Sequence, residues 1–358
     1  MMAQLQLALA SDSKSMNLPV ESDAPSEQPS LGKPKTSLFG VFKTLVIAFV
    51  VVVSLLSFPS VLPWMVAFWL VWASVLLFRN RPGWLPLLTC FVILAVKLVP
   101  RTPAMIVLGC VMLIVIAIRI RYRHHRLYDR RFAGFCVAAL WGCWGWMFYE
   151  FHAIANSSRT LVLDPARPVV CLGDSLTQGM IPDRGYPGAL EAMIRVPVVN
   201  RGFSGIATSQ GLGQMDRVLA DHPQVVVIEL GGHDFLKGHS RAATKANLLK
   251  MIQTCRDHDA EVILMEIPRG FIFDPFASLE REIAYEQDVQ LVADTWLRQI
   301  VVMSPVAPPG MWMPGFQLSD DGIHSNPAGS KAIAVRVAEA LQKMVGDDIR
   351  VKPTPKNR

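Results

Sequence analysis

The feature that most constrains this chain is a concentration of long apolar runs in its first half. Residues Leu38–Phe58 read LFGVFKTLVIAFVVVVSLLSF, enough to cross the roughly 30 Å core of a bilayer as a helix. Four further apolar runs follow, at Val61–Phe78, Trp84–Val99, Pro103–Ile118 and Phe132–Tyr149. The third and fourth of these five runs, Trp84–Val99 and Pro103–Ile118, are short for full spans. Because the runs carry almost no charge on any side, they favour membrane helices over the alternative of a helical bundle in water.

Charge placement predicts the orientation of these helices. The formal charge is +6, and the segment Arg119–Arg131 supplies +5 of it from six arginines and one aspartate. Basic segments beside membrane spans mark the cytoplasmic side. Alternation then places the N-terminus and Arg79 inside, Arg101 outside, and everything after about His152 on the periplasmic or extracellular side. Nucleic acid is the alternative partner for this segment. We expect none, because no second basic patch or interleaved aromatic residues accompany it.

Composition divides the chain into four parts. Residues 1–36 are rich in Ser, Pro and charge, which predicts a disordered cytoplasmic N-terminus. Residues 37–151 form the expected multi-pass transmembrane region of about five helices, with the lipid bilayer as partner. Residues 152–350 form a second domain, and residues 351–358 a disordered tail. The first apolar run begins late and has no clear cleavage site, so it is expected to be retained as an anchor.

The second domain alternates short apolar stretches with helical patterns. Buried strands are predicted at Pro168–Leu172, Pro197–Asn200, Val225–Leu230 and Val262–Ile267, with a weaker candidate at Val289–Ala293. Helices are predicted between them, for example at Ser240–Asp257, and a last helix is predicted to begin near Pro327. This alternation predicts an α/β fold, a three-layer sandwich around a parallel sheet of about five strands. Functional residues in such folds lie beyond the carboxyl ends of the strands.

Two motifs at these positions suggest acyl-transfer chemistry. CLGDSLTQG (Cys171–Gly179) follows the first strand, where a tight turn at Gly173 would present the hydroxyl of Ser175 at the sheet edge. The alternative is that Ser175 caps a helix. SDDGIHSNP (Ser319–Pro327) precedes the last helix, and its spacing can bring the carboxylate of Asp321 to one nitrogen of His324, as a general base requires. The alternative is a capping aspartate beside a surface histidine.

Two further glycine-containing stretches follow predicted strands. They are VVNRGFSG (Val198–Gly205) and ELGGHD (Glu229–Asp234). Taken together with the first two motifs, they resemble the SGNH hydrolases, the GDSL lipase/esterase superfamily, over roughly Pro168–Val345. The likeness is to the bacterial multifunctional thioesterase/lysophospholipase type, whose blocks occur in the order Gly-Asp-Ser, Asn-x-x-x-Ser-Gly, Gly-Gly-Asn-Asp and Asp-Gly-Ile-His. The resemblance implies a flavodoxin-like three-layer α/β/α sandwich.

The resemblance also implies a role for each matching residue. Ser175 would be the nucleophile, His324 the base and Asp321 the residue that orients it. The backbone N–H groups of Ser175 and Gly205 would face the oxyanion. The remaining residues of the blocks would support this site: Gly173, Asp174, Asn200, Gly232 and Asp234.

The third block departs from the family pattern, because the oxyanion asparagine is replaced by His233. An imidazole can supply the one N–H donor that this role needs. The hypotheses are an active hydrolase with His233 as electrophile, or an altered and weakened site. A metal-ligand role is disfavoured, since no converging ligands accompany His233, and we expect no metal and no cofactor. Asp234 is expected to pin the loop, and Tyr186 is a candidate for lining the acyl or alcohol pocket.

The chain is therefore predicted to be a membrane-anchored serine esterase of the EC 3.1 class. Its expected substrates are carboxylic esters: lysophospholipids, other lipids or acylated glycans. Two alternatives remain. One is an O-acyltransferase that uses the same serine on an envelope glycan or lipid, and the other is a degenerate SGNH domain that binds a ligand without catalysis.

Overall fold

The computed structural model describes residues 45–52, 61–121, 130–180, 184–269, 274–293, 297 and 318–346. Several predictions fall outside this part of the chain. They are the disorder expected at 1–36 and 351–358, residues 122–129 of the basic segment, and all of the first apolar run except residues 45–52, which are helical.

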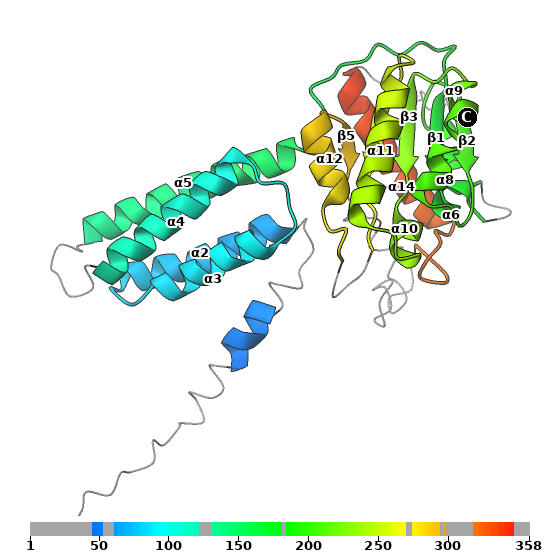
Figure 1. Cartoon of the computed structure of the whole chain (residues 1–358). Helices are drawn as coiled ribbons and strands as arrows, with labels where there is room; N and C mark the ends of the chain where they lie inside the picture. Colours follow the sequence, from blue (N-terminus) through cyan, green and yellow to red (C-terminus); the bar gives the residue numbers. More distant parts are fainter. Residues whose placement is uncertain are drawn as a thin grey trace, which may run out of the picture. The chain divides into compact units, whose positions relative to one another are not determined.

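Four helices in the described part of the first half form a bundle (Figure 1). They are α2 (Leu62–Phe78), α3 (Trp84–Val96), α4 (Pro103–Arg121) and α5 (Arg130–Ala153). Both α2 and α4 pack on α3 and on α5, so each helix has two neighbours. The prediction of an all-helical region is confirmed for these residues.

The bundle has apolar residues both inside and outside. Leu70, Leu108 and Leu140 are fully buried between the helices, whereas Trp64, Ile114 and Phe135 are exposed. Two described helices, α4 with 19 residues and α5 with 24, are long and apolar enough to cross a membrane. The helices α2 and α3 are shorter, with 17 and 13 residues. Among the described residues, the evidence for membrane association is therefore limited to the length and composition of α4 and α5.

The second half folds around a parallel sheet, as predicted. Its strands, among the described residues, are β1 (Val169–Gly173), β2 (Val198–Gly202), β3 (Val225–Glu229), β4 (Glu261–Met265) and β5 (Gln290–Val292). They lie in the order β2-β1-β3-β4-β5, and every neighbouring pair is parallel. Each strand overlaps the stretch predicted for it, including the weaker candidate that became β5.

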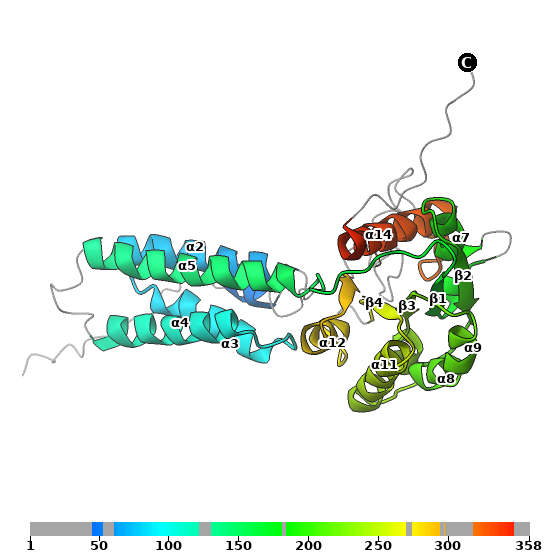
Figure 2. The ribbon, with the colours of Figure 1, turned by 90° about the horizontal axis from the view of Figure 1, so that it is seen from above.

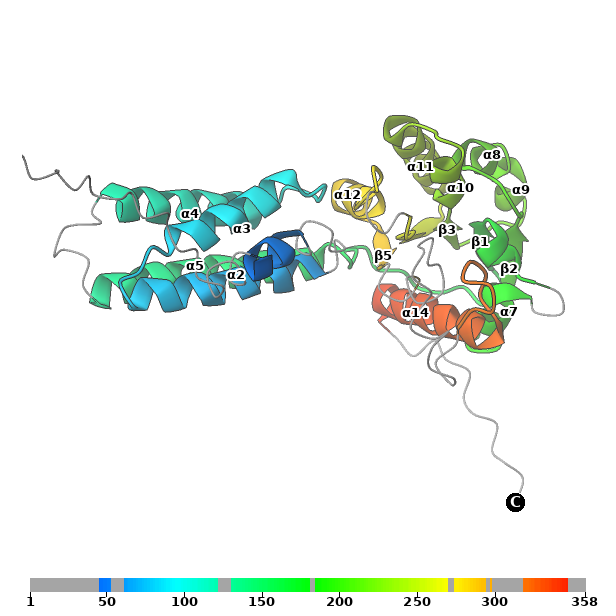
Figure 3. The same ribbon diagram turned by 90° about the horizontal axis from the view of Figure 1, so that it is seen from below.

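Helices cover both faces of the sheet, which explains why its strands are apolar throughout. Figures 2 and 3 show α7 (Gly185–Glu191) and α14 (Pro327–Val345) on one face. The opposite face carries α8 (Thr208–Leu212), α9 (Met215–Leu219), α11 (Arg241–Arg256) and α12 (Leu279–Gln287). Alternate residues of one strand enter the two cores: Cys171 packs with the α14 side and Val170 with the α11 side. The three-layer sandwich is thereby confirmed.

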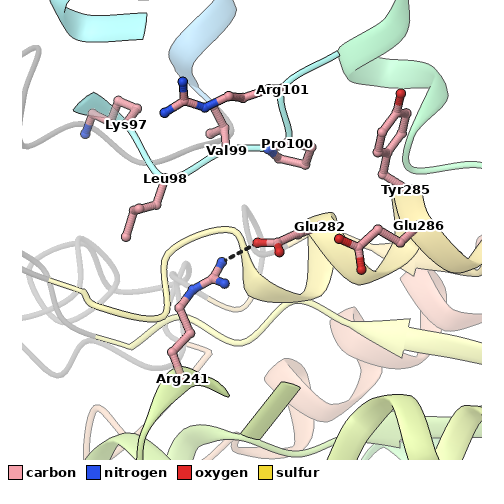
Figure 4. Close-up of a pocket in the computed structure, with 9 residues that line it drawn as sticks. All are labelled: Lys97, Leu98, Val99, Pro100, Arg101, Arg241, Glu282, Tyr285 and Glu286. Atoms are coloured by element: carbon pink, nitrogen blue, oxygen red, sulfur yellow. Dashed lines mark hydrogen bonds and ion pairs between the residues drawn. The ribbon is translucent and has the colours of Figure 1, made fainter. Parts of the chain in front are cut away.

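Ion pairs join the two longer helices of the second face. Arg241 of α11 donates to Glu282 of α12 at 2.8 Å, as Figure 4 shows, and Lys245 contacts Glu282 at 2.6 Å and Glu286 at 2.8 Å. The two cations and two anions alternate, so this partly exposed cluster aligns α12 with α11.

The strand order determines where a site can form. Chain connections run to opposite sides of β1, since β2 lies on one side of it and β3 on the other. Such a reversal leaves a crevice outside the carboxyl ends of the strands. The first three sequence blocks follow β1, β2 and β3, and the fourth immediately precedes α14. The fold therefore brings all four blocks to one edge of the sheet.

Candidate active site

The turn after β1 presents Ser175, and its hydroxyl does not cap the helix that follows. The short helix α6 (Ser175–Gln178) begins there, and its N-cap is Asp174, whose carboxylate accepts a hydrogen bond from the Leu176 N–H at 3.1 Å. The alternative that Ser175 caps this helix is therefore excluded. A side chain at Gly173 would collide with Thr177 and Glu229, so only glycine fits this close approach.

A histidine and an aspartate line up behind this serine. His324 Nε2 lies 3.1 Å from Ser175 Oγ, and His324 Nδ1 lies 2.6 Å from Asp321 Oδ2. Asp321 Oδ1 also accepts hydrogen bonds from the backbone N–H groups of Ile323 and His324, at 2.8 and 2.7 Å. The Asp321 carboxylate thus organises the turn from Asp321 to His324. It holds Nδ1 of the imidazole, and Nε2 is directed at Ser175.

Hydrogen bonds keep Asp321 ionised. Partial burial opposes its charge, but the backbone and side-chain hydrogen bonds from His324, with that from the Ile323 N–H, outweigh burial and lower the pKa of Asp321. A carboxylate that stays negative at Nδ1 favours the tautomer with its proton on Nδ1, which leaves Nε2 able to accept a proton from Ser175.

The second block anchors the end of the nucleophile helix. Asn200 donates from Nδ2 to the carbonyls of Thr177, Gln178 and Arg184 at 3.0 to 3.2 Å. Its Oδ1 accepts the Gly202 N–H at 2.9 Å. Asn200 therefore ties β2 to the turn that carries Ser175. It supports the site without facing the reacting atoms.

Gly205 ends the second block in a conformation that suits glycine. Its φ is +78°, and its carbonyl accepts a hydrogen bond from Lys237 Nζ at 2.8 Å. Within the described part of the chain, the Gly205 N–H donates to no acceptor. A left-handed glycine with an unused N–H is well suited to receive a developing oxyanion.

The third block begins a five-residue helix, α10 (Gly232–Leu236), with Gly231 at its N-cap. His233 is the second residue of α10, and its side chain is 24% exposed, with Nε2 3.9 Å from Asp174 Oδ2. Asp174 thus lies between the nucleophile turn and the histidine that replaces the family asparagine. Gly232 lies against the same carboxylate, where an added β-carbon would make ordinary contact.

Asp234 is the buried anchor of this loop. Its carboxylate accepts hydrogen bonds from Thr208 N–H and Oγ at 2.8 and 2.7 Å and from Thr244 Oγ at 3.1 Å. His239 Nδ1 lies 3.1 Å away. Burial opposes the charge of Asp234, but these hydrogen bonds lower its pKa. Asp234 therefore connects α10 to α8 and α11 as a structural carboxylate.

Two further features of this region concern possible metal ligands and Tyr186. Among the described residues, no group of three or more His, Cys, Asp or Glu side chains converges as a metal site would require. Tyr186 is fully buried in the core beneath α7 and α14. The prediction that Tyr186 lines a substrate pocket is therefore wrong, because its ring fills the interior of the sandwich.

A buried carboxyl pair lies under the nucleophile turn. Glu229, at the end of β3, is fully buried, and its Oε2 accepts from the Asp174 N–H at 3.2 Å and from Thr177 Oγ1 at 2.9 Å. Burial raises the pKa of Glu229 well above its ordinary value, and the nearby Asp174 charge raises it further. Burial also raises the pKa of Asp174, although the Leu176 N–H and His233 oppose this. Burial and the Asp174 charge both favour the protonated form of Glu229.

Some of these supporting residues could have been found from the sequence, and others could not. Glu229 carries a detectable signal, since it is a charged residue ending an otherwise apolar strand. Thr177 and Gln178 lie inside the first block, but nothing in their spacing indicates that they contact β2 and β3. Gln178 Oε1 accepts the Ser204 N–H at 2.8 Å, a contact that exists only once the sheet is assembled.

Comparison with known proteins relates the chain to acylhydrolases. Residues 171–332 match the model of the GDSL-like lipase/acylhydrolase family. The chain is 31% identical to an arylesterase of Vibrio mimicus over 55% of this chain and 95% of the relative. It is 32% identical to thioesterase 1/protease 1/lysophospholipase L1 of Escherichia coli (strain K12), over 51% of this chain and 87% of the relative. A crystal structure of TesA has 25% identity and a TM-score of 0.37, covering 50% of this chain and 100% of that one.

The raised pKa of Glu229 predicts a pH dependence of stability. The folded chain retains a proton that the unfolded chain releases above about pH 4.3, so stability falls as pH rises from there toward the raised folded-state pKa. Glu229→Gln keeps an oxygen for the Asp174 and Thr177 donors but does not ionise. We expect the variant to lose less thermal stability than wild type between about pH 5 and about pH 8, measured by the unfolding temperature.

Glu191→Gln is the matched control for this experiment, because Glu191 is an exposed glutamate on α7. It should reproduce the wild-type dependence on pH. Parallel curves for wild type and Glu229→Gln would show that Glu229 is ionised in the folded protein.

Proposed function

This chain belongs to the GDSL-like lipase/acylhydrolase family, which makes it an ester hydrolase, and we propose that Ser175, His324 and Asp321 are its catalytic triad. One observation carries the proposal. A single imidazole bridges the two other groups, with Nε2 3.1 Å from Ser175 Oγ and Nδ1 2.6 Å from Asp321. Ser175 lies in the first block, whereas Asp321 and His324 lie in the fourth. The contact between Ser175 and His324 therefore depends on the fold of the domain and not on proximity along the chain.

The geometry supports a two-step acyl transfer. Ser175 Oγ attacks the ester carbonyl while His324 Nε2 accepts its proton, and Asp321 stabilises the imidazolium. The C–O bond to the alcohol then breaks, and His324 returns the proton to the departing oxygen. Water, deprotonated by His324, cleaves the acyl-Ser175 ester in the second step. Acid and alcohol leave, and the triad returns to its starting state.

Three N–H donors are proposed to stabilise the oxyanion. Two are the backbone N–H groups of Ser175 and Gly205, and the third is the imidazole of His233. The Gly205 N–H has no acceptor among the described residues, which supports its part. The place of His233 at the start of α10, near Asp174, supports the part of the imidazole. His233 Nε2 lies 3.9 Å from Asp174 Oδ2, which is too far for a hydrogen bond between them. An N–H of this imidazole would supply the donor that the family takes from an amide.

The substrate class is proposed from the relatives and the apolar bundle. One relative carries the name arylesterase and another the name thioesterase 1/protease 1/lysophospholipase L1. For this chain we favour carboxylic esters of lipids, lysophospholipids among them, with acylated glycans as the second class. A catalytic domain that is joined to apolar helices α4 and α5 would act close to a bilayer, where such esters lie.

The membrane arrangement is also a proposal. The helices α4 and α5 are apolar enough to span, and the arginine-rich segment Arg119–Arg131 lies between them. With this segment in the cytoplasm, α5 would deliver the sandwich to the periplasmic or extracellular face. The shorter α2 and α3 would complete a multi-pass region, and the N-terminus would be cytoplasmic.

A covalent probe tests the nucleophile. Full-length protein in detergent should be labelled by a fluorophosphonate and should hydrolyse a short p-nitrophenyl ester with water as acceptor. Ser175→Ala should lose both properties, with ester turnover falling by a factor on the order of 10⁶. Ser209→Ala, an exposed serine on α8, is the matched control and should behave as wild type. An unlabelled wild type would favour the ligand-binding alternative, and labelling without hydrolysis would favour the acyltransferase.

Substitution of His233 tests its donor role. Removing one oxyanion donor costs roughly 10²–10³ in turnover, so we expect His233→Ala to lower kcat by that order with little change in KM. His233→Asn, which restores the amide of the family pattern, should recover most of the loss and alter the dependence of kcat on pH. A wild-type kcat and pH profile in His233→Ala would remove His233 from the mechanism.

Labelling from one side of the membrane tests the topology. In a background lacking Cys110 and Cys143, Lys250→Cys on exposed α11 should react with a membrane-impermeant maleimide in intact spheroplasts. Arg130→Cys, at the start of α5, should react only after permeabilisation. The opposite pattern would place the catalytic domain in the cytoplasm.

A further inference from the structure

A buried arginine lies behind the turn that carries His233. Arg269 follows β4, and its residue is 2% exposed. Its Nε donates to the Gly231 carbonyl at 3.0 Å. Its remaining nitrogens form an ion pair with Glu280 of α12, which is fully buried, and the guanidinium lies 5.1 Å from the ring centre of Phe276. The guanidinium therefore links α12 to the Gly231–Gly232 turn.

The conformation of the turn at Gly231 leaves room for the Arg269 side chain. Gly231 has φ of +125°, and a β-carbon there would collide with Arg269 Nη2, so glycine is needed both for the backbone conformation and for the contact. The Gly231 carbonyl also accepts the Phe235 N–H at 3.4 Å, the bond that starts α10. Arg269 thus holds the oxygen from which the helix carrying His233 begins.

A contribution to the stability of the fold does not by itself explain the buried Arg269–Glu280 pair. A buried ion pair must overcome the cost of removing both charges from water, and apolar residues of the same volume often stabilise as well. Burial raises the pKa of Glu280 to about 7 even with the Arg269 charge opposing it. What an apolar pair could not supply is the directed N–H at Gly231. A guanidinium can hold a carboxylate on one edge and donate from Nε on another.

We propose that Arg269 is a positioning residue for the oxyanion side of the site, holding the Gly231 carbonyl so that α10 presents His233 to the substrate, with Glu280 fixing the guanidinium. This role rests on the proposed function of His233 as an oxyanion donor. Arg269 contacts the loop that carries the donor, and it acts on the reaction only through that loop.

The substitution Arg269→Lys distinguishes the proposed positioning role of the guanidinium from the effect of its positive charge. Arg269→Lys retains a cation for Glu280 but offers no fixed second donor to Gly231. Misplacing a catalytic group by about 1 Å can cost on the order of 10²-fold, so we expect kcat for a short p-nitrophenyl ester to fall about 10-fold to 10²-fold, with KM within about twofold. The full-length protein in detergent is used throughout.

Arg281→Lys is the matched control. Arg281 is a second buried arginine on α12, paired with Glu266 at 2.8 Å, and among the described residues it donates nothing to the Gly231–Asp234 turn. It shares the burial and the charge of Arg269 without the contact, so its substitution should leave kcat near the wild-type value. An equal fall in kcat for both lysine variants would overturn the proposal, because general loosening of α12 would then explain it.

A double-mutant cycle with His233→Ala completes the test. If Arg269 acts through His233, Arg269→Lys should lower kcat in wild type and have almost no effect once His233 is alanine. A full additional loss in the double variant overturns the proposal. Should Arg269→Lys not fold, Glu280→Gln gives the same cycle, because it frees the guanidinium while leaving Arg269 in place. If His233→Ala itself has wild-type kcat, the oxyanion role of His233 fails instead, and the two failures remain distinct.

Discussion

The hydrogen bond from the Leu176 N–H to the Asp174 carboxylate is the interaction on which the site depends. By capping α6, Asp174 relieves Ser175 of that task and leaves its hydroxyl for His324. The same carboxylate faces His233 across the site. One aspartate thus sets the start of the nucleophile helix and lies near His233, so the nucleophile and the proposed oxyanion donor are arranged around a shared buried group.

The supports of the site are polar groups buried where an apolar core would be the simpler choice. Glu229 lies beneath the nucleophile turn, Asp234 is the buried residue of α10, and Arg269 lies behind Gly231. Each of them holds backbone N–H or C=O groups of a loop at the carboxyl end of the sheet. Buried polar groups are costly unless they are satisfied, and when satisfied they fix geometry more narrowly than apolar contacts do. In this domain the free-energy cost of burying polar groups occurs at the loops that the proposed chemistry requires in one position.

Much of this organisation was predictable from the sequence. Runs of four to seven apolar residues interrupted by helical patterns indicated a parallel sheet covered on both faces, because only strands buried on both sides lack polar alternation. The carboxyl ends of parallel strands share one edge, so the four blocks could be placed together before any coordinates. Boundaries were displaced by a residue or two, and Tyr186 was misplaced, since an aromatic residue after a catalytic loop gives no indication of whether it faces a pocket or the core.

The sequence by itself predicted the sheet and the helices of the first half, because periodicity encodes them directly, and the resemblance of four short blocks to a known family indicated Ser175, Asp321 and His324 as candidate site residues. Only the tertiary structure decided that Asp174 caps α6, that Asn200 binds two carbonyls of α6 and the carbonyl of Arg184, and that Arg269 reaches Gly231. Those contacts join residues from different strands and helices. Their partners become neighbours only when the order β2-β1-β3-β4-β5 brings separate loops to one edge, and no spacing along the chain records that distance.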